Sequence, residues 1–202
     1  MPPTDTSGRT LALADIADLR AYERERPDFL RHVMALKARR RVGVGPILTF
    51  VFENRDTVRF QVQEMARVEK LISDEAVQAE LDIYNTLIPE PGTLSATMFV
   101  ELTSDQLLRR WLPRLVGVER AVRLELVGGE RIAARPDADH DDQLTDDTVT
   151  ASVHYVRFEL TAAQVEAVAA GPVALAVDHP AYQERTVLVP ETVAELLSDL
   201  RG

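Results

Sequence analysis

The sequence contains no cysteine, and this absence excludes several kinds of chemistry. Without thiolates the chain has no disulfide, no cysteine nucleophile, no zinc–thiolate site and no iron–sulfur cluster held by its own residues. Any metal ion bound by this chain would therefore have oxygen and imidazole ligands.

Long apolar runs are also missing. No run approaches the roughly 18 residues that a membrane-spanning helix needs, and "MPPTDTSGRT" lacks the basic and apolar regions of a secretory signal. The net charge of −10 repels phosphate backbones and argues against nucleic-acid binding. We therefore expect a cytoplasmic protein that binds neither membranes nor nucleic acid.

The hydrophobic content, 46% of 202 residues, is enough for one substantial core. We predict a single domain, residues 1–202, in which residues 1–12 are disordered. Helical periodicity dominates the start of the chain, including a helix that restarts at Pro27. Segments with strand character follow at 47–52, 93–103, 121–136, 150–161, 172–179 and 185–189.

Helices at 104–118, 162–170 and 191–200 interrupt the strands, and Gly128 with Gly129 predicts a hairpin turn. The expected fold class is α+β, with a helix-rich N-terminal half packed on a mainly antiparallel β-sheet formed largely by the C-terminal half. The acidic segment 136–148 is expected to be a solvated loop.

Three short patterns do not support a phosphate, calcium or anion site. "GVGPIL" has only two glycines, follows a helical pattern and carries Pro46 where a backbone donor would be needed. Asp137, Asp139 and Asp141 imitate a calcium loop, but the glycine and the final glutamate of that loop are missing. We interpret the basic run 37–41 as a solvated helix end, where cations are favourable.

Two glutamates occupy unexpected positions in a predicted pair of helices, residues 57–87, that meets near Ile72 and Ser73. Glu64 and Glu80 each fall inside an apolar stripe at helical spacing. The first stripe contains Phe60, Met65, Val68, Leu71 and Ile72, and the second contains Val77, Leu81, Tyr84, Leu87 and Ile88. We therefore predict that both carboxylates face the core.

Each of these glutamates lies eight residues from the predicted turn, so the two should be neighbours on antiparallel helices. Adjacent buried carboxylates need a positive partner or a shared proton. One interpretation is an arginine, with Arg55, Arg59 and Arg157 as the candidates.

The alternative partner is a divalent metal ion. His154 and His179 lie on the predicted inward faces of their strands, which adds imidazole to the two carboxylates. A mixed set of this kind suits iron, manganese or zinc. The candidate metal ligands are therefore Glu64, Glu80, His154 and His179.

Several longer segments resemble an uncharacterised bacterial family, a domain of unknown function. They are "LKARRRVGVGPILTFVFENRDTVRFQVQEMARVEKL", "ELDIYNTLIP", "SATMFVEL", "VHYVRFEL" and "VDHPAYQERT", within residues 19–182. The resemblance implies genes often encoded beside rubrerythrin and an iron–sulfur oxidoreductase subunit, and hence a link to redox or peroxide-stress metabolism. It implies no activity and no catalytic residue.

Three hypotheses follow. The first is a soluble accessory or binding protein that docks with rubrerythrin or an iron–sulfur protein, with its buried carboxylates held by arginine. The second is a metal-dependent enzyme or metal-binding protein that uses the Glu/His set between the helical hairpin and the sheet. The third is a homodimer in which the polar positions of the helical stripe lie at an interface.

Overall fold

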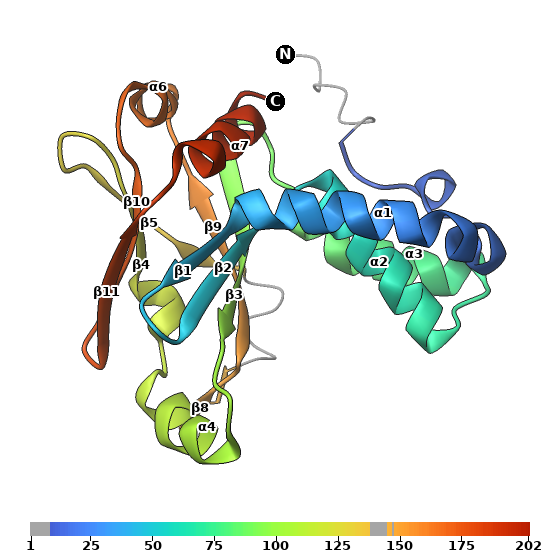
Figure 1. Ribbon diagram of the computed structural model, residues 1–202, viewed down its shortest axis with the longest axis horizontal. Helices are drawn as coiled ribbons and strands as arrows, with labels where there is room; N and C mark the ends of the chain where they lie inside the picture. The colour runs from blue at the N-terminus through green and yellow to red at the C-terminus, as the bar shows by residue number, and fades with distance from the viewer. Residues whose placement is uncertain (1–8, 138–144, 147) are drawn as a thin grey trace.

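The computed structural model describes residues 9–137, 145–146 and 148–202. Three helices project to one side of the β-sheets (Figure 1) and are called the helical arm below. They are α1 (Leu19–Arg40), α2 (Arg55–Glu69) and α3 (Asp74–Tyr84). Asn54 caps the start of α2 and Ser73 that of α3, so the predicted hairpin and its turn near Ile72 are confirmed.

The strands form two main sheets in which neighbouring strands are antiparallel. The first sheet has the order β1 (Arg41–Val44), β2 (Leu48–Phe52), β3 (Thr93–Val100), β9 (Val153–Glu159) and β6 (Arg135–Pro136). The second has the order β11 (Tyr182–Val187), β10 (Ala174–His179), β4 (Val122–Glu125) and β5 (Arg131–Ala133). A short pair joins β7 (Thr145–Asp146) and β8 (Val149–Thr150). The α+β class is confirmed, with two sheets in place of one.

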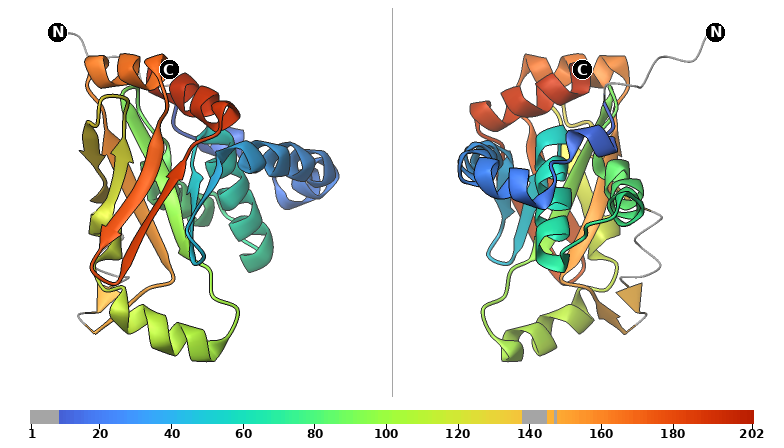
Figure 2. Two further views of the ribbon diagram at one scale, coloured as in Figure 1. Left: turned by 60° about the vertical axis from the view of Figure 1, so that its left-hand side comes forward. Right: turned by 90° about the vertical axis from the view of Figure 1, so that its right-hand side faces the viewer.

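The main core lies between the two sheets, which face each other in Figure 2. Phe50 and Phe52 of β2 and Phe158 of β9 are fully buried there, in one cluster with Leu124 of β4 and Leu175 of β10. Because side chains alternate along a strand, the residues between these positions point to the opposite face of the first sheet. That opposite face is turned toward the helical arm (Figure 2).

Three further helices lie around the sheets. α6 (Ala162–Ala170) and α7 (Pro190–Arg201) pack together beside one end of the strands (Figure 2), whereas α4 (Asp105–Trp111) lies at the other end (Figure 1). Ser104 caps α4, and Pro113 lies in the 3₁₀ turn that follows it. The predicted helices here, and the hairpin with positive φ at Gly128 and Gly129, are confirmed.

Helix α1 is continuous through Pro27, so the predicted restart at this proline is wrong. Proline removes the N–H that would bond to the carbonyl of residue 23. Both Glu23 and Pro27 are exposed, so water can satisfy that carbonyl. Burial of Tyr22 before the proline and Val33 after it holds the two halves of the helix against the rest of the arm.

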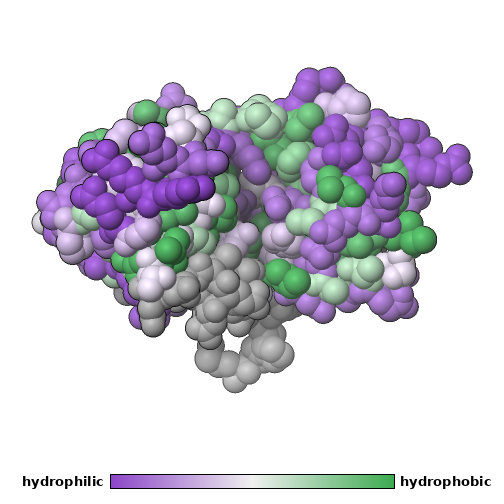
Figure 3. Space-filling model, turned by 90° about the horizontal axis from the view of Figure 1, so that it is seen from below, coloured by the Kyte–Doolittle hydropathy of each residue, from purple (hydrophilic) through white to green (hydrophobic). Residues whose placement is uncertain are grey.

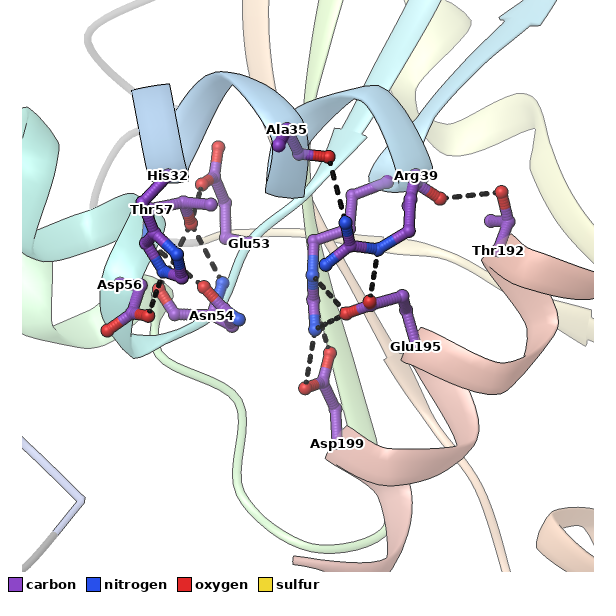
Figure 4. Close-up of polar contacts among 11 residues, drawn as sticks. His32, Ala35, Arg39, Glu53, Asn54, Asp56, Thr57, Thr192, Glu195 and Asp199 are labelled. Atoms are coloured by element: carbon purple, nitrogen blue, oxygen red, sulfur yellow. Dashed lines mark hydrogen bonds and ion pairs between the residues drawn. The ribbon is translucent and has the colours of Figure 1, made fainter. Parts of the chain in front are cut away.

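The basic run at the end of α1 is not uniformly solvated. Arg40 is 2% exposed and donates to both carboxylate oxygens of Asp199 on α7, at 2.6 and 3.0 Å, and to Glu195 at 3.2 Å. Arg39 is exposed and donates to Glu195 at 2.6 Å (Figure 4). Arginine is the cation best suited to two carboxylates at once, so this pairing fastens the arm to α7.

The N-terminal segment is packed where the structure describes it. Leu11 is 3% exposed, and its backbone N–H donates to the side-chain oxygen of Asn85 at 2.8 Å. The predicted disorder of residues 1–12 therefore does not hold for Leu11 and its neighbours, since this leucine joins the smaller core of the helical arm. Most of the predicted acidic loop 136–148, including His140, lies outside the described residues.

Across the described part of the chain, no helix is long and apolar enough to span a membrane.

Candidate functional site

The outer face of the first sheet carries one row of side chains across four strands. Arg41 is paired with Val51, Val51 with Thr97, and Thr97 with Tyr155. Directly paired residues on neighbouring strands project their side chains to the same face. The row therefore forms a floor of mixed polar and apolar character beneath the helical arm.

A crevice of about 240 Å³ lies between this floor and the arm. Val58 and Gln61 of α2, Tyr84 of α3, and Lys37 of α1 line it from the arm. The space-filling view from below shows the molecule hollowed between the sheets and the helices (Figure 3). The full lining is Lys37, Arg41, Val51, Glu53, Val58, Gln61, Tyr84, Leu87, Thr97, Phe99, Val153 and Tyr155.

Glu53 is the buried carboxylate of this crevice. It follows β2 directly and is 7% exposed. The hydroxyl of Thr57 donates to its Oε2 (Figure 4). The hydroxyl of Thr97 donates to its Oε1 at 2.5 Å. Among the described residues no lysine, arginine or histidine forms an ion pair with Glu53, so hydroxyl groups alone hold the carboxylate.

Tyr155 lies near enough to this carboxylate for the charge of Glu53 to act on its phenol. Burial raises the pKa of Tyr155 to about 12, and the charges of Tyr84, Glu53 and Asp137 add to the effect. Both causes disfavour the phenolate. Tyr155 is therefore a neutral phenol at physiological pH and serves the crevice as an aromatic wall with a polar hydroxyl.

The lining combines acidic, cationic, aromatic and aliphatic side chains, and none of its residues is histidine, serine or cysteine. What it offers is one buried acidic group, aromatic and aliphatic surface, and two cationic side chains, Lys37 and Arg41. These are the components of a small-molecule binding site.

Glu64, the first predicted metal ligand, is held by arginine. Arg26 donates to Glu64 through Nε at 2.7 Å and Nη2 at 3.0 Å, and Arg67 donates through Nη2 at 3.0 Å. The hydroxyl of Tyr22 adds a bond of 2.8 Å. The Arg26 hydrogen bonds, with those of Arg67 and Tyr22, outweigh burial and lower the pKa of Glu64 to about 2.

The kind of partner predicted for Glu64 is correct, but its identity is not. Of the three candidates, Arg55 pairs with Asp15, Arg59 donates to Glu25 and Arg157 donates to the Thr86 carbonyl. The two arginines that do hold Glu64, from α1 and from the next turn of α2, were not among them.

Glu80, the second predicted ligand, has a different environment. Burial raises its pKa, and the charge of Glu69 raises it further. Among the described residues no arginine is hydrogen-bonded to both glutamates, although they lie on adjoining helices, so the two carboxylates share no arginine partner.

The two histidines are engaged by other groups. Nε2 of His154, a residue 2% exposed, lies 2.9 Å from the Thr150 hydroxyl and 3.0 Å from the Ala151 carbonyl oxygen. Nε2 of His179 donates to the Val116 carbonyl at 3.1 Å, and Nδ1 accepts from the Ala181 N–H at 3.2 Å. Both ring nitrogens of His179 are thus in use within the fold.

No group of three or more His, Asp or Glu side chains suited to a metal ion occurs in the described ranges. Glu64, Glu80, His154 and His179 are consequently not assembled into one site. Iron, manganese or zinc bound by this set has no geometric support in these parts of the chain.

Glu53 was not predicted as a site residue, because in the sequence it lies at the polar end of the strand "LTFVFEN". Its partners come from two places: Thr57 is one helical turn ahead, but Thr97 lies on the neighbouring strand, 44 residues away. The one local signal was the placement of threonine four residues after the glutamate, which is common and unspecific.

Comparison with known proteins places the chain in a family. The family described as "Protein of unknown function (DUF3501)" matches residues 10–200. A solved structure, described as a novel protein of unknown function from Burkholderia pseudomallei K96243, is 36% identical and has a TM-score of 0.87; the similarity covers 95% of this chain and 99% of that one. Among curated proteins none matches. The chain therefore belongs to the DUF3501 family of proteins of unknown function.

Proposed function

We propose that this protein is a non-catalytic binding protein whose crevice holds a small organic molecule. The observation that carries the proposal is the enclosed space between sheet and arm, with the buried carboxylate of Glu53 at its floor. Pockets with an apolar lining and a few fixed polar groups are the usual form of small-molecule sites.

The proposal includes an accessory role in a bacterial redox or peroxide-stress system. Support for this part comes from the gene neighbours that the family resemblance implies, rubrerythrin and an iron–sulfur oxidoreductase subunit. A chain without cysteine would contribute to such a system through its ligand or its partner. Cytoplasmic location is part of the same proposal.

Blocking the crevice tests the binding role. Gln61 is exposed on α2 and lines the crevice, so Gln61→Trp should fill the space without disturbing the core. Val68→Trp is the matched control, because Val68 is 65% exposed on the same helix and outside the crevice lining. Native mass spectrometry and a thermal-shift screen of small metabolites would be run on all three proteins.

The expected result is a bound or stabilising metabolite in the wild type and in Val68→Trp that is lost in Gln61→Trp. If no small molecule binds the wild type, or if Gln61→Trp binds it equally well, the crevice is not the ligand site and the proposal fails.

A homodimer formed through the helical hairpin is the second candidate. Ile72 and Ile83, which are 88% and 47% exposed on the hairpin, favour it because exposed apolar side chains gather at interfaces. Size-exclusion chromatography with light scattering tests it. A monomeric mass at all concentrations would overturn it.

A further inference from the structure

We infer that the crevice binds a small zwitterion, with its ammonium group at Glu53 and its acidic group near Lys37 and Arg41. The inference rests on the proposed binding function and names the chemical class of the ligand. It is carried by the placement of one buried carboxylate and two cationic side chains around the same enclosed space.

Glu53 has unused capacity to bind a cation. A carboxylate offers about four lone-pair sites. Hydroxyl groups of Thr57 and Thr97 occupy one site on each oxygen. A buried charge is costly unless it is paired, and hydroxyl donors only partly offset that cost. An ammonium group entering from the crevice would complete the set as a charge-assisted hydrogen bond.

The walls around the carboxylate also suit an ammonium group. The aromatic side chains of Tyr84, Phe99 and Tyr155 line the same space. The faces of aromatic rings attract cations, most strongly where water is excluded. A neutral ligand would gain only contact area from these rings, whereas a cationic group would also be attracted electrostatically to their faces.

The two cationic side chains make a purely cationic ligand unfavourable. Arg41 is paired across the sheet with Val51, and Glu53 lies two residues beyond Val51. At roughly 3.4 Å per residue along a strand and about 5 Å between strands, the two backbone positions are on the order of 8 Å apart. Groups of opposite charge therefore border the same space, within the reach of one small molecule.

Both cations are available to an acidic group. Arg41 donates to Glu101 at 3.0 Å, but both side chains are 51% exposed, and exposed ion pairs contribute little. Lys37 lies with its ammonium group 5.5 Å from the centre of the Phe60 ring, and among the described residues it forms no ion pair. An anion that binds Lys37 and Arg41 at the mouth of the crevice would therefore break only a weak existing interaction.

Free α- and ω-amino acids, which separate their two charges by different distances, are the probes, together with their carboxamides and N-acetyl derivatives. Each amide keeps only the positive charge, and each N-acetyl derivative keeps only the negative one. Titration calorimetry on the wild type should detect at least one free amino acid, with binding about tenfold or more weaker for both of its derivatives. Equal binding of the N-acetyl derivative would overturn the inference.

Two variants locate the charges. Glu53→Gln should abolish discrimination between the free amino acid and its N-acetyl form, whereas Lys37→Met, which leaves Arg41 in place, should reduce discrimination against the carboxamide. Lys37 lies at a partly exposed position, so Lys37→Met keeps the experiment decisive if Glu53→Gln does not fold. Unchanged discrimination in Lys37→Met, or in a folded Glu53→Gln, would overturn the inference.

The failure of this inference can be told apart from failure of the proposed function. A neutral or singly charged metabolite that binds the wild type and is lost in Gln61→Trp would overturn the zwitterion and leave the binding function standing. If no metabolite or amino acid binds, both are overturned.

Discussion

Arg26 on α1 donates two hydrogen bonds to the carboxylate of Glu64 on α2, from Nε at 2.7 Å and from Nη2 at 3.0 Å. Tyr22, one turn earlier on α1, donates to the same carboxylate at 2.8 Å. These contacts join α1 and α2, the two longest helices of the arm, and both α1 residues come before Pro27. A carboxylate predicted to need an arginine or a metal ion is thus satisfied by arginines of the arm itself.

Glu64→Gln should destabilise the fold by about 2 kcal/mol at pH 7. A carboxyl group whose pKa falls from 4.5 to about 2 on folding contributes at most ~3 kcal/mol, and partial exposure of the side chain reduces this. The contribution is complete above the ordinary pKa of 4.5 and is lost as the pH falls through about 2. Urea unfolding of both proteins at several pH values measures the difference.

The difference between the wild type and Glu64→Gln should therefore shrink as the pH falls from 4.5 toward 2. Glu23→Gln is the control, because Glu23 is exposed on α1 and its loss should change stability little. A constant difference across this pH range would show that the ion pair is not its source.

Glu80→Gln should have the opposite effect and stabilise the protein at pH 7 by up to ~1 kcal/mol. Burial and the charge of Glu69 raise the pKa of Glu80, so its ionised form is disfavoured in the folded state. The gain should be present at neutral pH and should vanish once both states are protonated below the ordinary value of 4.5.

Glu69→Gln provides the matched comparison for Glu80. It removes the repulsion but leaves the burial of Glu80, so its gain in melting temperature should be smaller. The two gains should not add, since they share one interaction. A loss of stability in Glu80→Gln would mean that an unrecognised partner stabilises the carboxylate.

The hairpin of α2 and α3 could be predicted from sequence because apolar residues recur at helical spacing on both sides of the turn near Ile72. The buried face of α2 could not. The prediction chose the bulkiest apolar residues, yet Val68 and Ile72 are exposed while Val62 is buried and Gln63 is completely buried. Gln63 receives the Ala17 N–H at 2.7 Å, so a distant backbone segment decides which face is inside.

The same limit explains why Glu64 and Glu80 were treated alike. Spacing along a helix places each side chain on a face, but the neighbouring elements determine its charge environment. Arg26 donates to Glu64 from α1, 38 residues away in sequence, whereas Glu80 is under the repulsive charge of Glu69. The crevice around Glu53 is a product of the same tertiary arrangement, because its floor and its roof come from different elements.

Replacing Arg40 should be far more harmful than replacing Arg39, although the two are adjacent. Arg40→Met removes the cation from Asp199 and leaves a partly buried carboxylate unpaired, which costs about 3–5 kcal/mol. Arg39→Met removes an ion pair whose arginine side chain is 45% exposed, and should cost less than about 1 kcal/mol. Chemical denaturation of both variants gives the two values.

A second substitution checks the reason for the Arg40 effect. Asp199→Asn in the Arg40→Met background removes the unpaired charge, so it should restore part of the lost stability. If the double variant is less stable than Arg40→Met, the loss comes from packing of the arginine stem and not from the orphaned carboxylate.

Gly45 at the turn between β1 and β2 should not tolerate alanine, whereas Gly43 should. Gly45 has a φ of +63°, and a Cβ there would collide with the Tyr182 hydroxyl and the Glu184 side chain. The left-handed backbone costs about 1–2 kcal/mol for alanine, and displacing Tyr182 breaks its 2.6 Å hydrogen bond to the Val44 carbonyl, worth about 1 kcal/mol more. A Cβ at Gly43 would meet no atom within 4 Å. Thermal unfolding should therefore show Gly45→Ala to be about 2–3 kcal/mol less stable than the wild type and Gly43→Ala nearly unchanged. Equal losses of stability in the two variants would mean that the turn does not depend on contact with β11.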